Sequence, residues 1–287
     1  MIKKIKDFLY LGRLNRPIGA LLLAYPCFWG VAMAKPDLKL LTCYTIIFFI
    51  GAFSMRAAGC AWNDILDKNI DKLVPRTQKR PIASGKLSVV EGIMFIFFNS
   101  LIGLVILFVL PLKAIIIAIL SIPLAIIYPL TKRISYFPQI WLGITFNIGI
   151  LIGYSSITKN YPTAEIVLMY LGAIFWTVGY DTMYSIQDYK DDIRYNIKSS
   201  AVKMGEYSGV FASICYLLST VLFFIAIFKN HSGYIPLTFV TLTGIWQAYS
   251  SFSTKVNDAK KGYRNFQISN ISGLIIWLSI LLDLIIK

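Results

Sequence analysis

The sequence predicts an all-α, polytopic integral membrane protein with about nine transmembrane helices in one bundle. Two observations support this fold class. Hydrophobic residues make up 57% of the 287 residues, well above the roughly 45–50% of an average soluble domain. Apolar blocks of about 18–22 residues recur along the whole chain, and each is long enough to cross a hydrocarbon core of ~30 Å. We therefore expect residues 1–287 to form a single membrane-embedded domain.

The chain opens with a basic, amphipathic stretch, MIKKIKDFLYLGRLNRP. No small-residue cleavage site follows its first apolar run, so it does not resemble a removable signal peptide. A short helix on the cytoplasmic membrane surface is the expected structure, because one face is apolar and the other carries lysine. We assign residues 1–16 to this interfacial lead segment.

Nine apolar segments follow, and prolines near the starts of several of them fit helix N-termini, where a missing N–H is tolerated. The expected segments are 17–34, 40–62, 88–110, 112–130, 138–157, 163–187, 208–228, 234–253 and 266–286.

Lysine and arginine are distributed unevenly over the connections between these segments. The connections on the side of the N-terminus carry 21 of the 28 basic residues, and those on the other side carry 6. The positive-inside rule then places the N-terminus and the long loops 63–87 and 188–207 in the cytoplasm. A bacterial inner (cytoplasmic) membrane, multi-pass location is the expectation, with the functional site on the cytoplasmic side, where the long connections lie.

The net charge of +14 does not indicate nucleic-acid binding, because the basic residues lie between apolar blocks, where they set topology. The four cysteines are scattered and form no CxxC pair, so a disulfide framework or a structural zinc site is not expected.

The first acidic motif, NDxxDxxxD, comes at the end of the second segment and consists of Asn63, Asp64, Asp67 and Asp71. If the helix continues, the three aspartates fall at i, i+3 and i+7 on one face. Like charges at this spacing repel, and more strongly in a partly desolvated site. A bound cation is therefore expected to compensate them.

The second acidic motif, DxxYxxxDxxxD, ends the sixth segment and consists of Asp181, Tyr184, Asp188 and Asp192. The spacing of the first motif recurs here 117 residues later. A single aspartate at a helix end is commonly a solvated interface residue. Two acidic faces at cytoplasmic helix ends indicate a ligand instead, since ionisable groups at membrane depth normally face a cavity or a partner.

Basic residues accompany both motifs and suit phosphate recognition. The planar guanidinium group of arginine can donate two parallel hydrogen bonds to phosphate oxygens, and lysine binds phosphate as a point charge. Arg56 lies seven residues before Asn63 and is expected on the same face, paired with the acidic groups. The others are Arg76, Arg80, Lys132 and Arg133, together with Arg13 and Arg16 before the first apolar segment. Carboxylates interleaved with arginines predict a diphosphate held through Mg²⁺. Tyr184 is expected to face the same cavity and to stabilise a transient cation through its π face.

These motifs resemble the UbiA-type intramembrane prenyltransferases. The resemblance rests on NDxxDxxxD, the following RTxxRP, the YPLTKR loop and DxxYxxxDxxxD, and it covers nearly the whole chain. The RxxRPIGxLLL opening and the MRAAGCxxND lead-in look most like the 4-hydroxybenzoate polyprenyltransferases of ubiquinone synthesis.

The resemblance implies a site and a reaction. Mg²⁺ held by Asp64, Asp67 and Asp71, and by Asp181, Asp188 and Asp192, would bind the diphosphate of a polyprenyl chain. Asn63, Arg76, Lys132 and Arg133 would neutralise the leaving group. The allylic cation would then be attacked by the ring carbon of 4-hydroxybenzoate ortho to its hydroxyl, in a cavity open to the lipid bilayer.

Three other functions remain open at this stage. The acceptor could be a naphthoate, homogentisate or haem, because few residues specify it. A cation-coupled transporter would place its ionisable groups near the midplane at broken helices, often in inverted repeats, whereas these clusters lie at helix ends. A membrane scaffold without chemistry would leave the paired acidic clusters unexplained.

Overall fold

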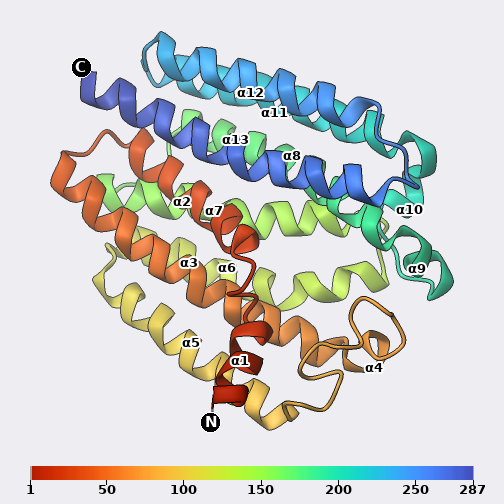
Figure 1. Ribbon diagram of the computed structural model, residues 1–287. Coiled ribbons are helices and arrows are strands. Elements are labelled where there is room, and N and C mark those ends of the chain that lie inside the picture. Colours follow the sequence, from red (N-terminus) through yellow and green to blue (C-terminus); the bar gives the residue numbers. More distant parts are fainter. Residues whose placement is uncertain (1, 287) are drawn as a thin grey trace. The chain divides into compact units, whose positions relative to one another are not determined.

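The computed structural model describes residues 2–286, which form helices, turns and loops with no strand among them (Figure 1). The chain divides into two compact units. The first consists of Met1–Ala24 and Ile46–Leu110, and the second of Tyr25–Thr45 and Pro111–Lys287. The all-α fold class is confirmed, and the single-domain organisation predicted for residues 1–287 stays a prediction.

The first unit contains the N-terminal helix and the first acidic motif. Its helices are α1 (Ile2–Leu11), the first residues of α2 (Ile18–Met33), most of α3 (Leu38–Leu66), α4 (Lys68–Asp71) and α5 (Val89–Val109). Helix α5 begins with a capping box, in which the Ser88 hydroxyl accepts from the Glu91 amide and the Glu91 carboxylate accepts from the Ser88 amide. This cap fixes the end of the long loop that precedes α5.

Helix α1 packs against the rest of the first unit through one apolar face. Leu11 belongs to a buried cluster with Ala61, Ile82 and Leu87, and the Phe8 ring stacks on Phe95 with the ring centroids 5.6 Å apart. The cluster joins α1, α3 and the loop that follows α4. The predicted lead helix is therefore present, and its position on a membrane surface stays a prediction.

The second unit is built around α8. Its elements are the remainder of α2, the first turns of α3, α6 (Leu112–Ile127), η1 (Tyr128–Arg133), α7 (Pro138–Thr158), α8 (Ala164–Ser185), η2 (Ile186–Asp188), α9 (Tyr189–Arg194), α10 (Ser200–Met204), η3 (Gly205–Tyr207), α11 (Ser208–Lys229), α12 (Tyr234–Phe252) and α13 (Ala259–Ile286). Helix α8 packs against α7, α11 and α13, and α12 packs against α11 and α13.

Buried polar side chains join these helices by hydrogen bonds. The Asn147 amide of α7 donates to the Ala173 carbonyl (3.1 Å) and to the Thr177 hydroxyl (2.8 Å), both on α8. The Ser269 hydroxyl of α13 pairs with the Tyr216 hydroxyl of α11 (2.9 Å) and accepts from the Gln247 amide of α12 (2.9 Å). Such bonds fix helix pairs in an apolar environment, where polar groups have few other partners.

Each of the nine predicted apolar segments corresponds to a long helix among residues 2–286. Seven stretches are long and apolar enough to cross a membrane: Leu38–Leu66, Val89–Val109, Leu112–Arg133, Pro138–Thr158, Ala164–Arg194, Ser200–Lys229 and Ala259–Ile286. Helix α2 is apolar but has only 16 residues. Helix α12 has 19 residues and is less apolar than these seven. Nine spans is therefore an approximate count.

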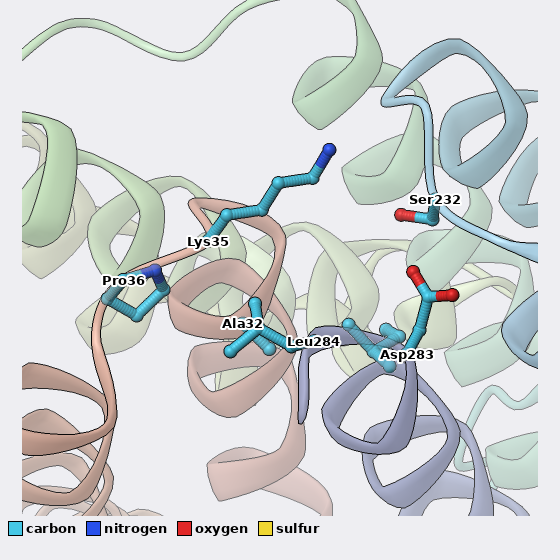
Figure 2. A pocket seen from close by; sticks show the side chains of 7 residues that line it. Ala32, Lys35, Pro36, Ser232, Asp283 and Leu284 are labelled. Carbon is cyan, nitrogen blue, oxygen red and sulfur yellow. The ribbon is translucent and has the colours of Figure 1, made fainter. Parts of the chain in front are cut away.

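A small cavity of about 250 Å³ lies at the end of α13 that is remote from the acidic motif of this unit (Figure 2). Asp283 and Lys35 contribute its charged groups, and both already have partners. Both carboxylate oxygens of Asp283 accept from the Gly233 amide, at 2.9 and 2.8 Å, at the N-terminus of α12. The Lys35 ammonium donates to the Asn230 carbonyl at 2.6 Å. These groups cap helix ends, where charges of these signs are stabilising.

Glycines allow α2 and α7 to approach closely within the second unit. A Cβ on Gly30 would overlap the Ile150 carbonyl, and one on Gly153 would overlap the Cys27 carbonyl. Gly149 and Gly153 form a GxxxG pair, which favours close backbone contact between membrane helices.

We expect Gly30→Ala to lower the unfolding temperature of the detergent-purified protein by several degrees, because the new methyl group meets backbone rather than a flexible side chain. Gly59→Ala is the matched control. A Cβ there meets nothing within 4 Å, and alanine favours the interior of α3. Thermal unfolding that ranks Gly30→Ala at or above Gly59→Ala would contradict the close packing of α2 on α7.

Candidate active site

The first acidic cluster, defined as Asp64, Asp67 and Asp71, lies at the junction of α3 and α4. Helix α3 ends at Leu66, and Asp67 is the N-cap of α4. The helical hydrogen-bond spacing nevertheless continues, since the Asp67 amide donates to the Asn63 carbonyl (2.9 Å) and the Asp71 amide to the Asp67 carbonyl (2.8 Å). All three aspartates are buried, with exposed fractions of 1%, 3% and 5%. The predicted common face is therefore retained through the break.

Two arginines pair with this cluster. The Arg13 Nη2 lies 2.7 and 3.0 Å from the two carboxylate oxygens of Asp64. The Arg80 Nη1 lies 3.2 Å from Asp64 Oδ1 and 2.8 Å from Asp71 Oδ2. One guanidinium thus contacts both the first and the last carboxylate of the motif. Removing one partner of a buried ion pair typically costs about 3–5 kcal/mol, so these contacts hold the loops to the helix end.

The loop after α4 folds back so that Arg80 reaches the cluster. The Thr77 hydroxyl donates to the Asp71 carbonyl at 3.0 Å, and the Arg80 amide donates to the Thr77 carbonyl at 2.8 Å. Ile82, two residues later, is fully buried in the cluster with Leu11. Arg76 is exposed, in contrast to Arg80. The second arginine of the RTxxRP motif therefore contacts the carboxylates, and the first is the more exposed of the two.

Burial raises the pKa of Asp71 above its ordinary value of 3.8. Arg80 opposes this rise, whereas the negative charge of Asp64 adds to it. Burial by itself would lower the pKa of Arg80, but the carboxylates of Asp64 and Asp71 outweigh it and raise that pKa. Burial thus opposes the ionised form of Asp71, whereas the neighbouring carboxylates favour the charged form of Arg80, so a cation close to Asp71 offsets the cost of burying its charge.

Arg56 and Asn63 are half-buried on α3. Gly19 of α2 makes room for the arginine, since a Cβ there would lie 2.9 Å from both Nε and Nη2 of Arg56. The predicted pairing of Arg56 with the acidic face stays a prediction. Arg16 is exposed, and Arg13, three residues earlier, is the arginine that contacts the carboxylates.

The second acidic motif lies in the second unit, and its helix is interrupted. The acidic helical face predicted from the spacing of Asp181, Tyr184, Asp188 and Asp192 stays a prediction. Helix α8 ends at Ser185, a 3-10 turn covers Ile186–Asp188, and α9 begins at Tyr189. Tighter winding at the turn changes the angular spacing of residues on either side of it.

Polar contacts position the end of this motif. Asp192 is buried, and its Oδ2 accepts from the Ser199 hydroxyl at 2.9 Å. The Ile197 amide donates to the Asp192 carbonyl at 2.8 Å, which closes the turn after α9. Asp181 and Asp188 are half-buried. The Tyr184 ring packs on Phe266 of α13, with the ring centroids 4.9 Å apart.

The loop of Lys132 and Arg133 lies beside the loop that follows the second motif. The Lys198 amide donates to the Lys132 carbonyl at 3.3 Å, and its ammonium donates to the Ile134 carbonyl at 3.1 Å. The YPLTKR segment forms η1, in which Lys132 is half-buried and Arg133 is exposed. Within the second unit, the predicted basic residues and the predicted acidic residues are thus carried by adjacent loops.

The donor chemistry of both motifs suits Mg²⁺, a hard cation that prefers carboxylate oxygens together with phosphate and water. Among residues 2–286, no three acidic, histidine or cysteine side chains are grouped so as to hold a metal ion. Arginine nitrogens contact Asp64 and Asp71 instead. The metal roles of the six aspartates, and the predicted convergence of the two motifs on one ligand, stay predictions.

The contacts of two residues with the acidic motifs were not predicted from the sequence. Arg13 appeared in the RLNRP stretch only as one of two basic neighbours, and its positive φ of 59°, which directs the chain after α1, has no sequence signal. Ser199 lies seven residues after Asp192 and outside both motifs, so only the fold shows that it donates to this carboxylate.

Similarity to known proteins extends over most of the chain. The model of the UbiA prenyltransferase family matches residues 23–272. The chain belongs to this family. Its UbiA relatives include the mitochondrial 4-hydroxybenzoate polyprenyltransferase of Drosophila pseudoobscura pseudoobscura, 36% identical over 98% of this chain and 71% of the relative. The 4-hydroxybenzoate octaprenyltransferase of Marinomonas sp. (strain MWYL1) is 32% identical over 97% of this chain and 98% of the relative.

The fold is also found among solved UbiA structures. A UbiA homolog from Archaeoglobus fulgidus bound to DMAPP and Mg²⁺ aligns with a TM-score of 0.73 and 15% identity, over 98% of this chain and 100% of that one. This likeness confirms the helical architecture expected for a UbiA-type prenyltransferase.

The raised pKa of Asp71 predicts a pH dependence of stability in metal-free buffer. The folded protein holds the Asp71 proton more tightly than the unfolded chain does, so the contribution of this residue to stability falls as the pH rises from about 4. Asp71→Asn removes that contribution. We therefore expect its unfolding temperature, relative to wild type, to increase between pH 4 and pH 7.

The control for the charge change is Asp37→Asn, at an exposed helix cap where asparagine can also accept from the Leu40 amide. A relative stability of Asp71→Asn that falls with rising pH would mean that the ion pair with Arg80 outweighs burial.

Proposed function

We propose that this UbiA-family protein transfers a polyprenyl group from polyprenyl diphosphate to the ring of 4-hydroxybenzoate, in a Mg²⁺-dependent reaction of ubiquinone biosynthesis. The observation that supports the chemistry is the burial of three carboxylates beside two guanidinium groups at one helix end. Such a site suits a ligand that carries both a divalent cation and negative oxygens. Family membership directs the proposal to a prenyl diphosphate.

The acceptor and the cofactor are proposed from the relatives. Proteins named 4-hydroxybenzoate polyprenyltransferase and octaprenyltransferase match this chain over nearly its full length. A solved UbiA homolog of the same fold is described as bound to DMAPP and Mg²⁺. We therefore assign Mg²⁺ to Asp64, Asp67 and Asp71, and to Asp181, Asp188 and Asp192.

Mg²⁺ bound to these carboxylates would neutralise charge on the leaving diphosphate. The protein's own cationic groups would assist it: Arg16, Arg56, Arg76, Arg80, Lys132 and Arg133, with Asn63 as a hydrogen-bond donor. Preorganised positive charge at the place where negative charge develops is usually the largest catalytic contribution. Arg80 is the best placed of them, because its guanidinium group contacts the carboxylates of both Asp64 and Asp71.

The reaction conserves atoms and charge as follows. The bond between the allylic carbon and the diphosphate oxygen breaks, and its electron pair leaves with the diphosphate. The ring carbon of 4-hydroxybenzoate ortho to the hydroxyl forms the new carbon–carbon bond, and the proton on that carbon is then released, so that the products are the prenylated acid, diphosphate and one H⁺. Apolar surroundings keep water from the cation. The Tyr184 ring would stabilise this charge through its π face.

The bilayer would supply the isoprenoid substrate. Helix α5 exposes a continuous apolar surface that includes Ile93, Phe97 and Val105, as expected of a lipid-facing helix. We assign the protein to a bacterial inner (cytoplasmic) membrane, with the N-terminus and the active site on the cytoplasmic side, because the basic residues concentrate in those connections.

The test is an assay of detergent-purified protein with a long-chain prenyl diphosphate, Mg²⁺ and a panel of aromatic acids. We expect prenylated 4-hydroxybenzoate and one equivalent of inorganic diphosphate, detected by mass spectrometry and phosphate chemistry, and no product in EDTA. Prenylation of a naphthoate or of homogentisate instead would reassign the acceptor. Solute movement in liposomes without any prenyl transfer would favour the transporter.

The same assay includes one variant from each acidic motif, Asp64→Asn and Asp188→Asn. Each is expected to lose activity by at least about 10²-fold, the usual scale for removing one electrostatic contact to a developing anion. Asp37→Asn, at the opposite end of α3 from the first acidic cluster, should retain wild-type activity. Wild-type rates in either motif variant would contradict the metal assignment.

A further inference from the structure

Arginine side chains already contact both carboxylate oxygens of Asp64 and one of Asp71 in the first acidic cluster. Both oxygens of Asp64 accept from Arg13 Nη2, at 2.7 and 3.0 Å, and Oδ1 also accepts from Arg80 at 3.2 Å. Asp71 Oδ2 accepts from Arg80 at 2.8 Å. Asp64 is only 1% exposed, so its carboxylate has almost no surface open to solvent. A cation can reach the oxygens of Asp64 only if an arginine moves away.

We propose that Arg13 and Arg80 are exchangeable counter-ions of the first acidic cluster. They neutralise the carboxylates in the absence of ligand, Mg²⁺ displaces them, and the released guanidinium groups bind the diphosphate. This proposal rests on the proposed function and adds a regulation to it. Mg²⁺ and the diphosphate favour each other's binding. Mg²⁺ replaces the arginines as the partner of the carboxylates, and the diphosphate replaces the carboxylates as the partner of the arginines.

The charges explain why the two ligands are coupled. Three ionised carboxylates and two guanidinium groups carry a net charge of −1, so the cluster is nearly balanced without metal. When Mg²⁺ binds alone, it must break the arginine contacts, and the two guanidinium groups then lie unpaired beside the metal ion, which is also positive. A diphosphate group gives the released arginines an anion of matching geometry, in which two N–H groups meet two oxygens. The metal therefore binds weakly alone and more tightly with the diphosphate, and the coupling is reciprocal.

The positions of the two arginines in the fold allow them to move while the carboxylates stay. Asp64 belongs to the 29-residue helix α3, whereas Arg13 and Arg80 come from loops. Arg13 has a φ of 59°, a left-handed backbone conformation that is unfavourable for a residue with a Cβ. Its Nη1 donates to the Tyr10 carbonyl at 2.8 Å, at the end of α1. Release of Nη2 from Asp64 therefore leaves the contact of Nη1 with the end of α1 intact.

The experiment compares metal binding by the full-length, detergent-purified wild type and by Arg13→Gln, with Mn²⁺ as an electron-paramagnetic-resonance probe and no diphosphate present. Exchange predicts that Arg13→Gln binds Mn²⁺ about tenfold more tightly, because the metal no longer competes with a guanidinium for Asp64. Lys79→Gln is the matched control. It removes the same charge beside Arg80 from an exposed side chain, and its Mn²⁺ affinity should stay within about twofold of wild type, since exposed charges are screened.

Thermal unfolding gives a second readout. In EDTA, Arg13→Gln should unfold at a lower temperature than wild type, because Asp64 has lost a counter-ion. In saturating MgCl₂ the difference should close. If Arg13→Gln does not fold, Arg13→Lys keeps the charge with a single contact point and should show an intermediate Mn²⁺ affinity. An affinity of the folded variant equal to or below that of wild type overturns the proposal. So does a stability difference that is the same in EDTA and in MgCl₂, or a Lys79→Gln variant that binds Mn²⁺ as tightly as Arg13→Gln.

The outcomes separate this proposal from the proposed function. Tighter Mn²⁺ binding by Arg13→Gln, together with no transfer of a prenyl group to 4-hydroxybenzoate by wild type, would support the exchange and reject the acceptor. Mg²⁺-dependent prenylation by wild type, with unchanged Mn²⁺ affinity in Arg13→Gln, would support the function and reject the exchange.

Discussion

The contact between the Asp64 carboxylate and the guanidinium groups of Arg13 and Arg80 is the constraint on which the first unit depends. Asp64 is almost completely buried on a helix long and apolar enough to cross a membrane, and a carboxylate in such a place requires a cationic partner. The two arginines supply it from the turn after α1 and from the loop after α4. The same requirement makes the cluster a suitable site for a divalent metal ion. The carboxylate charges that the arginines neutralise in the fold are therefore the ones that would bind the metal.

The remaining packing places these loops where the arginines can reach the carboxylates. Leu11 and Ile82 enter one buried apolar cluster with Ala61 of α3, which fixes the residues just before Arg13 and just after Arg80. In the second unit, hydrogen bonds join the helices, and the Ser199 hydroxyl donates to the Asp192 carboxylate from the loop that follows α9. Rigid helices with charged groups on adjoining loops suit a site that must release one set of contacts to accept another.

The sequence was most informative where composition decides the structure. The segment expected at 88–110 is α5 (Val89–Val109), because the Ser88 cap and the apolar run mark both ends, and the segment expected at 138–157 begins at Pro138 as α7. It was less informative where tertiary contacts decide the backbone. No glycine or proline marks the interruption of α8 after Ser185, and the choice of Arg13 over Arg16 as the partner of Asp64 depends on a left-handed turn. The acidic motifs could be located from their spacing, whereas the arginine contacts within them could not, because long side chains reach many positions.

In the proposed reaction, a metal ion held by the first acidic cluster carries the diphosphate. The most direct measurement is electron–nuclear double resonance on the Mn²⁺-loaded protein in the presence of a non-reactive prenyl thiolodiphosphate. We expect a ³¹P hyperfine coupling that reports a phosphate oxygen bound directly to the protein-held metal, and a loss of that protein-bound signal in Asp64→Asn. Mn²⁺ that binds the protein without ³¹P coupling, or a coupling that is unchanged in Asp64→Asn, would contradict it.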